Sequence, residues 1–356
     1  MSLTSPISRP RDPATSCWSQ AQRSHRFRIA EDLYGPLARN ALGLFYLLRS
    51  GCPIEDHRAP GYGRPAGHSG VPPNQGDTAV SAWTGPEAAR LYPGWAPTER
   101  FDVSGGWCDA GDYGKYTVSG SIAVRQLLKV IELLQGVADR LAVLSQPTLV
   151  DIADAFDLQG FDFDRVAAPA RLDLAVSGAE LPDHDQVVDS VTQGALRMLK
   201  LQQDQPWGQP YAPPDGWAWG SNGRILNNLV VLAIAAQVTG DARFQAAVIT
   251  GIDYILGRNA LGQSYVTGYG RDATEHLRTR PFGHDLDPSL PSAPPGALAG
   301  GANSSQTPGF PSDPRLRGLP PQCCYLDEPT SETTNDVCIR WNAPLAYIAT
   351  YLSLGR

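Results

Sequence analysis

The chain has 356 residues, of which 42% are hydrophobic and 18% are charged, and its formal net charge is −7. This length can bury a substantial core in one large domain or two ordinary ones. The sequence contains no basic tract and no apolar run long enough to cross a bilayer, which argues against nucleic acid and membrane as partners.

The N-terminal stretch 1–24 is polar, contains proline and serine, and lacks the apolar core of a signal peptide. We expect it to be a disordered linker or remnant that precedes a single catalytic domain at 25–356. We therefore expect no export signal within the chain as written; a signal upstream of residue 1 would still allow secretion, so the localisation stays unknown. Its six cysteines are scattered without a zinc-like spacing, so reduced thiols are the default expectation.

Apolar residues recur every three or four positions in several segments, and this period predicts helices. The predicted helices are 31–49, 119–144, 186–202, 224–238, 242–256 and 342–353. The segment 147–184 is mixed, and period-two patterning is nearly absent. Two stretches rich in glycine and proline, 57–102 and 258–340, are expected to be long loops, which are usually functional in a compact domain. The sequence therefore predicts an all-α scaffold that carries active-site loops.

The stretch 104–116 reads SGGWCDAGDYGKY and places two carboxylates, Asp109 and Asp112, three residues apart. Only Ala110 and Gly111 separate them, so no bulky side chain would crowd a ligand. Such a turn can aim two acids at one point, or at one water, in an open cleft. The aromatic residues Trp107 and Tyr113 stand close on each side, as expected where a sugar ring must stack. A solvated acidic turn is the alternative reading of the Asp pair alone.

This stretch resembles the Gly-Gly-Trp-x-Asp-Ala-Gly-Asp-x-x-Lys-Tyr signature of family 9 glycoside hydrolases. Further stretches similar to that family are RPAGH at 64–68, WGSN at 219–222, YILGRN at 254–259, SYVTGYG at 264–270, PGAL at 295–298, GGAN at 300–303, CYLD at 324–327, NDV at 335–337 and WNAPL at 341–345. The resemblance covers most of 26–135 and 155–353. It implies an (α/α)6 barrel with long active-site loops, and an inverting endo-β-1,4-glucanase that acts on cellulose or a related β-glucan.

The resemblance also implies roles for three carboxyl groups. It makes Asp112 the general base and Asp109 a residue that helps to hold the attacking water. Inversion requires an acid and a base roughly 6.5–9.5 Å apart, the base ionised and the acid protonated. Because Asp109 and Asp112 are so close, their titrations should be coupled. Asp336 occupies the position of the proton donor, which in the family is a glutamate.

The proton-donor position leaves two readings open. Asp336 is one methylene shorter than glutamate, and a misplacement of about 1 Å can reduce a rate by ~10²-fold. Asp336 could instead only cap or hydrogen-bond near the closing helix. Glu332 takes the place of a tyrosine of the family, four residues before the donor, and either substitutes as donor or merely fills that site.

The resemblance also suggests residues that bind substrate. Arg280 and His276 lie in an imperfect His-x-Arg motif and could hydrogen-bond sugar hydroxyls, although a loop arginine is more often a structural ion-pair partner. Of the tryptophans near the motifs, we expect Trp107 rather than Trp217 or Trp219 to stack on sugar. We expect that no cofactor is required, and the sequence shows no recognisable cluster of metal ligands. The family allows a calcium ion, and its members are commonly secreted.

The middle of the chain departs from the family pattern. Several helical hairpins normally separate the Asp-Ala-Gly-Asp helix from the Trp-Gly-Ser-Asn block, whereas only residues 136–218 remain here. The barrel is therefore either incomplete or internally shortened, and the remaining helices should expose apolar faces. Two functions follow as hypotheses. One is a slow endoglucanase, and the other is a carbohydrate-binding pseudoenzyme or decayed relic without turnover.

Overall fold

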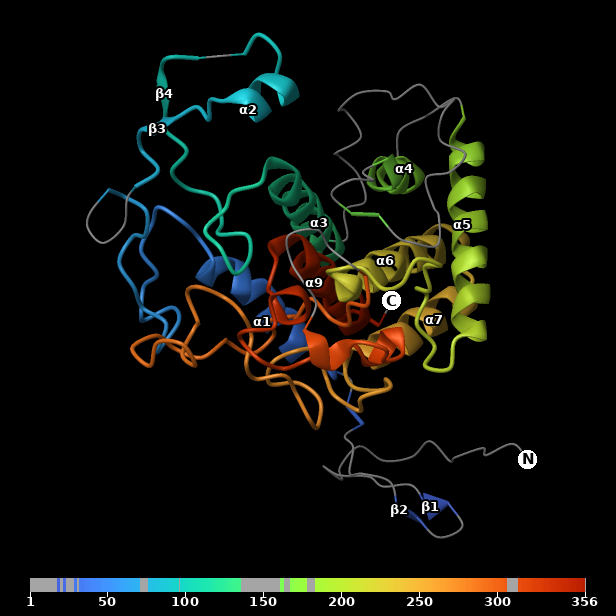
Figure 1. The fold of residues 1–356 in the computed structure, drawn as a ribbon. Coiled ribbons are helices and arrows are strands. Elements are labelled where there is room, and N and C mark those ends of the chain that lie inside the picture. The colour runs from blue at the N-terminus through green and yellow to red at the C-terminus, as the bar shows by residue number, and fades with distance from the viewer. Residues whose placement is uncertain are drawn as a thin grey trace.

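The computed structural model describes residues 18–19, 22–23, 29–30, 32–70, 76–95, 97–135, 161–162, 167–177, 183–305 and 313–355. Its longer helices are α1 (Gly35–Leu47), α3 (Thr117–Gln135), α4 (Ala167–Ala175), α5 (His184–Asp204), α6 (Ser221–Thr239), α7 (Ala242–Ile255) and α9 (Ile339–Ser353) (Figure 1). The short elements are α2 (Pro86–Leu91), α8 (Glu332–Asn335) and two 3-10 turns, Pro314–Leu316 and Pro321–Cys323. The prediction of an all-α scaffold is confirmed.

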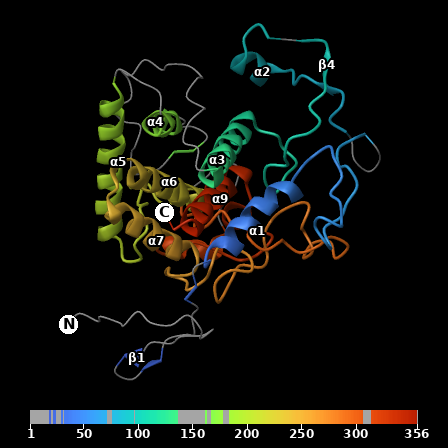
Figure 2. The same ribbon diagram turned by 180° about the vertical axis from the view of Figure 1, so that it is seen from behind.

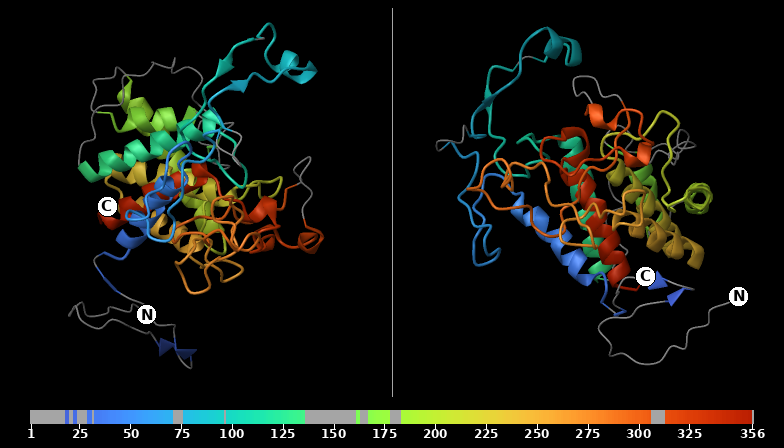
Figure 3. Two further views of the ribbon diagram at one scale, coloured as in Figure 1. Left: turned by 90° about the vertical axis from the view of Figure 1, so that its left-hand side faces the viewer. Right: turned by 60° about the horizontal axis from the view of Figure 1, so that its bottom comes forward.

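Helix α9 is the centre of the bundle. It packs against α1, α3 and α6, and both α1 and α3 run alongside it (Figure 2; Figure 3). Its residues from Trp341 to Leu352 are all buried, as are nearly all residues of α6 from Ser221 to Ala235. A helix that is apolar on all sides must be enclosed by neighbours, which explains why these two lie innermost. The amphipathic helix α5 covers α6 and α7 from outside.

The predicted helices are present, with boundaries that local chemistry sets. Helix α1 begins at Gly35 rather than near residue 31, because Pro36 is favoured in a first turn. Asp241 caps α7 by accepting a hydrogen bond from the Arg243 amide, and Gly240 ends α6 in the left-handed conformation. Of the predicted helix 119–144, the described part ends at Gln135, and residues 136–144 lie outside the described residues.

Two regions predicted without regular structure contain short strands. In the stretch 1–24 the structure describes only β1 (Trp18–Ser19) and β2 (Gln22–Arg23), which pair antiparallel. Within the predicted loop 57–102, β3 (Val80–Ser81) pairs with β4 (Arg100–Phe101) and α2 lies between them. Two-residue strands are too short to show an alternating pattern in the sequence.

Helix α3 carries an exposed apolar face. Val124, Ile131 and Leu134 are exposed on this helix, while Ala123 and Val130 are buried. The described residues hold seven helices of nine residues or more, fewer than the twelve that six α/α pairs would provide. The exposed face agrees with the expectation that a shortened middle region uncovers apolar surface.

Two glycines, one in the Trp-Gly-Ser-Asn block and one directly after it, let α6 approach α9. A Cβ atom at Gly220 or Gly223 would clash with the indole ring of Trp341. Gly220 also has a φ of 81°, which favours glycine. The block therefore brings the N-terminus of α6 against the start of α9.

Buried amides hold the long loop 258–303 on these helices. The Asn222 Nδ2 atom donates to the Ala299 carbonyl at 3.0 Å. The Asn342 Oδ1 atom accepts from the Leu298 amide at 2.8 Å. These two hydrogen bonds join side chains of α6 and α9 to the loop backbone, so the loop has a fixed course between the first turns of α6 and α9.

Candidate active site

The three predicted carboxylates line one cavity. The cavity has a volume of about 650 Å³ and lies beside the first turns of α3 and α9. Its lining includes Asp109, Asp112, Tyr116, Trp219, Asp336 and Arg340. Residues from opposite ends of the chain therefore meet at one place, as the motifs predict.

Asp336 is buried at the floor of this cavity and is only 6% exposed. Its Oδ1 atom accepts a hydrogen bond from the Gly111 amide at 2.6 Å. Burial, with a smaller contribution from nearby Asp112, raises the pKa of Asp336 to about 7, against the lowering effect of backbone amides and of Arg278. At neutral and mildly acidic pH this carboxyl group therefore holds a proton much of the time. That state suits the donor predicted at this position.

Gly111 makes the contact between the turn and Asp336 possible. A Cβ atom at this position would lie 2.7 Å from the Asp336 Oδ1 atom and 2.9 Å from the Arg278 Nε atom. Neither distance leaves room for a methyl group. A side chain at this position would therefore displace Asp336 and Arg278, and glycine lets the turn lie against a segment more than 200 residues away.

Asp112 is exposed and is held by donors from its own turn. Its Oδ1 atom accepts from the Gly114 amide at 2.9 Å, and its Oδ2 atom accepts from the Tyr116 hydroxyl at 2.8 Å. The hydrogen bond to Asp112, with partial burial, raises the pKa of Tyr116 to about 12. The hydroxyl therefore stays a donor, and the carboxylate has a fixed orientation.

Asp109 is buried, in contrast to Asp112, and is 3% exposed. Its Oδ1 atom accepts from the Cys338 Sγ atom at 3.2 Å, and its Oδ2 atom lies 4.0 Å from the Arg340 guanidinium. Burial raises the pKa of Asp109 to about 6, although Arg340 and Cys338 oppose the shift. The expectation of an open turn therefore holds for the exposed Asp112, whereas the Asp109 side chain is buried.

Arg340 is a site residue that the sequence analysis missed. Its Nε atom donates to Asp162 at 2.9 Å and its Nη1 atom donates to Ser119 at 3.1 Å. Asp162 also lies 3.3 Å from Arg224. The only sequence signal was a charged residue among the apolar residues that begin α9.

The predicted stacking residue Trp107 does not line the cavity. Its Nε1 atom donates to the Phe45 carbonyl at 2.8 Å, and its ring packs edge-on against the Phe45 ring. Trp217 is buried, whereas Trp219 lines the cavity. Tyr113 is exposed, and its ring lies 4.3 Å from the His68 ring. The packing of Trp107 against α1 favours a structural role, so Trp219 is the better candidate to contact a sugar.

The predicted substrate-binding loop is also arranged differently from the expectation. Arg280 is exposed and does not line the cavity, whereas Arg278 lies beside Asp336. Glu332 forms an ion pair with Arg278 at 2.8 Å, an arrangement that favours a charge partner over a substitute donor. The Nδ1 atom of His276 lies 3.1 Å from Asp285, and this hydrogen bond raises the pKa of His276.

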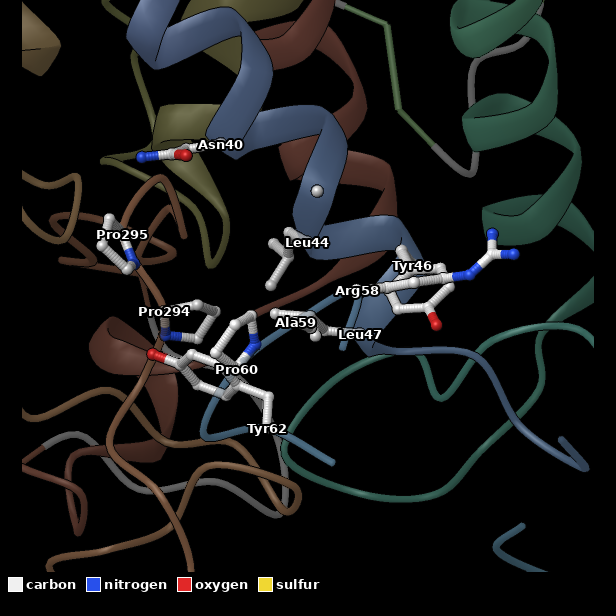
Figure 4. Close-up of a pocket in the computed structure, with 11 residues that line it drawn as sticks. Asn40, Leu44, Tyr46, Leu47, Arg58, Ala59, Pro60, Tyr62, Pro294 and Pro295 are labelled. Carbon is white, nitrogen blue, oxygen red and sulfur yellow. The ribbon is translucent and has the colours of Figure 1, made fainter. Parts of the chain in front are cut away.

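A second pocket lies between α1 and two loops. It has a volume of about 360 Å³, and Leu44, Tyr62, Pro294 and Pro295 are among its lining residues (Figure 4). Arg58 is the one charged residue of the lining, which includes no carboxylate. This pocket therefore lacks the groups that acid–base hydrolysis needs.

In the described part of the chain, no group of three or more His, Cys, Asp or Glu side chains is arranged to hold a metal ion. The described helices also include none that is both long and apolar enough to span a bilayer. The calcium ion that the resemblance allows stays a prediction.

Comparison with known proteins decides the family. The model of glycosyl hydrolase family 9 matches residues 34–155 and 149–349. The chain belongs to glycosyl hydrolase family 9. The two matched segments meet near residue 150, where the sequence analysis places the missing hairpins.

Curated relatives of this family 9 chain include two cellulases. It is 33% identical to endoglucanase C of Cellulomonas fimi over 497 residues, covering 94% of this chain and 45% of that protein. It is 25% identical to a cellulose 1,4-β-cellobiosidase of Acetivibrio thermocellus, covering 94% of this chain and 58% of that protein. The chain thus spans about half the length of these relatives. The 497-residue alignment is also longer than the whole chain, so the relative has segments that this chain lacks.

Solved structures agree on the fold. Family 9 endoglucanase J30 has a TM-score of 0.74 and 18% identity, covering 96% of this chain and 89% of that chain. A GH9 protein of Bacteroides ovatus superposes on this chain with a TM-score of 0.69 and 18% sequence identity. The match covers 96% of this chain and 90% of that chain. The mostly helical structure therefore matches the (α/α)6 barrels of family 9 endoglucanases.

The burial of Asp336 gives a pH-dependent stability that can be measured. The pKa of Asp336 rises from an ordinary 3.8 to about 7 on folding. Its stabilising contribution is thus complete below about pH 4 and is lost as the pH rises through about 7. We expect Asp336→Asn to be more stable than the wild type at pH 8, by on the order of 2–4 kcal/mol, and to lose this advantage at pH 4.

Thermal melts at pH 4, 6 and 8 check this expectation. The control is Asp272→Asn, which changes a carboxylate that is mostly exposed and should follow the wild type throughout. A stability difference between Asp336→Asn and the wild type that stays constant from pH 4 to pH 8 would contradict the account of Asp336.

Proposed function

We propose that this chain hydrolyses internal β-1,4-glucosidic bonds of cellulose or a related β-glucan by an inverting single displacement. The observation that carries the proposal is the unequal setting of two acids at one cavity. Asp112 is exposed and fixed by two donors, while Asp336 is buried with a pKa of about 7. Two carboxyl groups in such different environments suit a base and an acid.

The proposed reaction moves one proton at each group. Asp112 takes a proton from a water molecule as the water oxygen bonds to the anomeric carbon, and Asp109 helps to hold that water. Asp336 gives its proton to the glycosidic oxygen as the bond between the anomeric carbon and this oxygen breaks. The new hemiacetal has the inverted configuration. Asp112 then loses its proton to solvent and Asp336 regains one, which restores the starting state.

The substrate class rests on the relatives. The similar proteins named above are an endoglucanase and a cellobiosidase of cellulose, and the chain shares their family. We propose a slow rate, for two reasons. The aspartate side chain is shorter than the glutamate of the family donor, and the 497-residue alignment shows that this chain lacks segments of the relative within the aligned region.

A carbohydrate-binding protein without turnover is the second candidate. The observation that favours it is the 2.6 Å hydrogen bond from the Gly111 amide to Asp336. In this bond one oxygen of the Asp336 carboxyl group accepts a hydrogen bond that holds the turn, as an oxygen of a purely structural carboxyl group would. The exposed apolar face of α3 also fits an incomplete barrel.

Release of reducing sugar from a soluble β-glucan separates the two candidates. The hydrolase should release sugar in proportion to enzyme and time, and the Asp112→Asn protein should not. Proton NMR of the first products should show the α-anomer, since an inverting enzyme turns a β-linkage into an α-hemiacetal. Binding of oligosaccharide without any release supports the non-catalytic candidate, and initial β-anomer excludes inversion.

Tyr116 offers a test of how the base is positioned. The Tyr116 hydroxyl orients Asp112 through a charge-assisted hydrogen bond of 2.8 Å. We expect Tyr116→Phe to lower kcat about tenfold with a small change in KM, because such a bond is worth about 1.5 kcal/mol. Initial rates on soluble β-glucan measure both constants.

Tyr113→Phe is the matched control for this test. Tyr113 is an exposed tyrosine of the same turn, and its ring contacts His68 rather than either carboxylate. An unchanged kcat in Tyr116→Phe, or an equal loss in both variants, would remove the positioning role of Tyr116.

A further inference from the structure

Residues 80–95 and 97–101 form an arm whose strands, β3 and β4, lie away from the helical body (Figure 1). The pairing of Val80 with Phe101 closes its base, and α2 lies in its outer part. Helix α2 buries only Ala88 and makes no extensive contact with another described helix. The described part of the arm therefore has no core that would require large apolar side chains.

The arm nevertheless carries large aromatic side chains at its surface. Trp83 is 62% exposed, and Tyr92 and Trp95 are each 56% exposed. The ring of Trp95 is stacked near Phe101, with centroids 6.4 Å apart and planes at 19°. The ring of Tyr92 meets Trp95 edge-on, with centroids 6.0 Å apart. Clustered exposed aromatic surface of this kind marks a binding site.

The aromatic cluster is continuous with the cavity of the carboxylates. Tyr92 lines that cavity together with Asp112 and Asp336. From Tyr92 the ring contacts continue to Trp95 and then to Phe101. A ligand that extends out of the cavity past Tyr92 would therefore meet the Trp95 ring next.

The chemistry of the arm fits a sugar chain. A β-linked glucosyl ring keeps its hydroxyls at the edge and presents C–H bonds on both faces. Stacking of such a face on an aromatic ring removes apolar surface from water, which is favourable. The charged groups Glu87 and Arg90 of α2 bind each other at 2.8 Å and so partly neutralise one another. A β-1,4-glucan is also extended, so a chain longer than the cavity must cross its rim.

We propose that the arm binds the glucosyl units of a β-1,4-glucan that extend beyond the cavity, with Trp95 as the main stacking surface. This inference rests on the proposed glucan substrate but does not require turnover. It adds a binding surface outside the cavity and makes affinity depend on chain length.

The test compares a short and a long ligand in protein that cannot turn them over. Isothermal titration calorimetry on Asp112→Asn gives the Kd for cellobiose and for cellohexaose. Adding Trp95→Ala should weaken cellohexaose binding about tenfold, a loss of about 1.4 kcal/mol that one aromatic contact can supply, and should leave cellobiose binding unchanged. The matched control is Trp207→Ala, an exposed tryptophan after α5 that does not line the cavity.

The outcomes separate this inference from the proposed function. Unchanged cellohexaose binding in Trp95→Ala, or equal weakening of both ligands, overturns the arm as a glucan surface while the proposed function stands. If the Asp112→Asn protein binds neither ligand, the proposed function fails together with this inference. Sedimentation that shows Trp95→Ala to abolish a dimer, with sugar binding intact, would assign the aromatic cluster to self-association and also overturn it.

Discussion

Replacement of Asp112 by asparagine is expected to abolish glucan hydrolysis and to leave the melting temperature nearly unchanged. The amide cannot take a proton from water, and loss of a general base typically reduces a rate by ~10²–10⁴-fold. Asp112 is exposed, and its two hydrogen-bond donors belong to its own turn, so the fold does not depend on its charge. Reducing-sugar release and thermal melts measure the two effects.

Asp102→Asn serves as the control for this experiment. Asp102 is an exposed aspartate of the preceding loop, and it accepts a hydrogen bond from the Ser104 amide in the same local pattern. Its replacement should leave the rate unchanged. If Asp112→Asn keeps most of the wild-type activity, Asp112 is not the base.

Replacement of Asp336 by glutamate is expected to raise kcat. The added methylene extends the carboxyl group from the floor toward the glycosidic oxygen, and the cavity of about 650 Å³ has room for it. General-acid catalysis is typically worth ~10²–10⁴-fold, so better proton delivery should give a measurable gain from a low baseline. The gain should appear in kcat rather than KM, because the proton moves in the transition state.

Soluble β-glucan and an aryl cellobioside with an activated leaving group provide the measurement. The aryl substrate needs little protonation, so the gain from Asp336→Glu should be smallest on it. If the wild type is clearly active and Asp336→Glu has the same glucan turnover, Asp336 is not the proton donor, and Glu332 becomes the candidate. If neither the wild type nor Asp336→Glu hydrolyses the β-glucan or the aryl cellobioside, the carbohydrate-binding protein without turnover is the favoured candidate.

The sequence by itself determined the scaffold and the identity of the turn. The apolar period of three to four residues located the longer helices around α9, because burial of one helix face is a local pattern that the chain repeats. The full stretch 104–116 marked the site, because its resemblance to the family 9 signature is far more specific than the spacing of Asp109 and Asp112 alone. The short strands β3 and β4 were not predicted, because two residues are too few to show the alternating apolar pattern of a strand.

The tertiary structure decided how the acids differ and which neighbours they have. The sequence does not show that Asp109 and Asp112 differ in burial, yet Arg340 and Cys338 lie against Asp109 while Asp112 is exposed. Arg278 rather than Arg280 lies beside Asp336, and Trp219 rather than Trp107 lines the cavity. Proton affinity depends on burial and on charges within a few ångströms, and distant segments of the chain supply these charges only when the helices have packed.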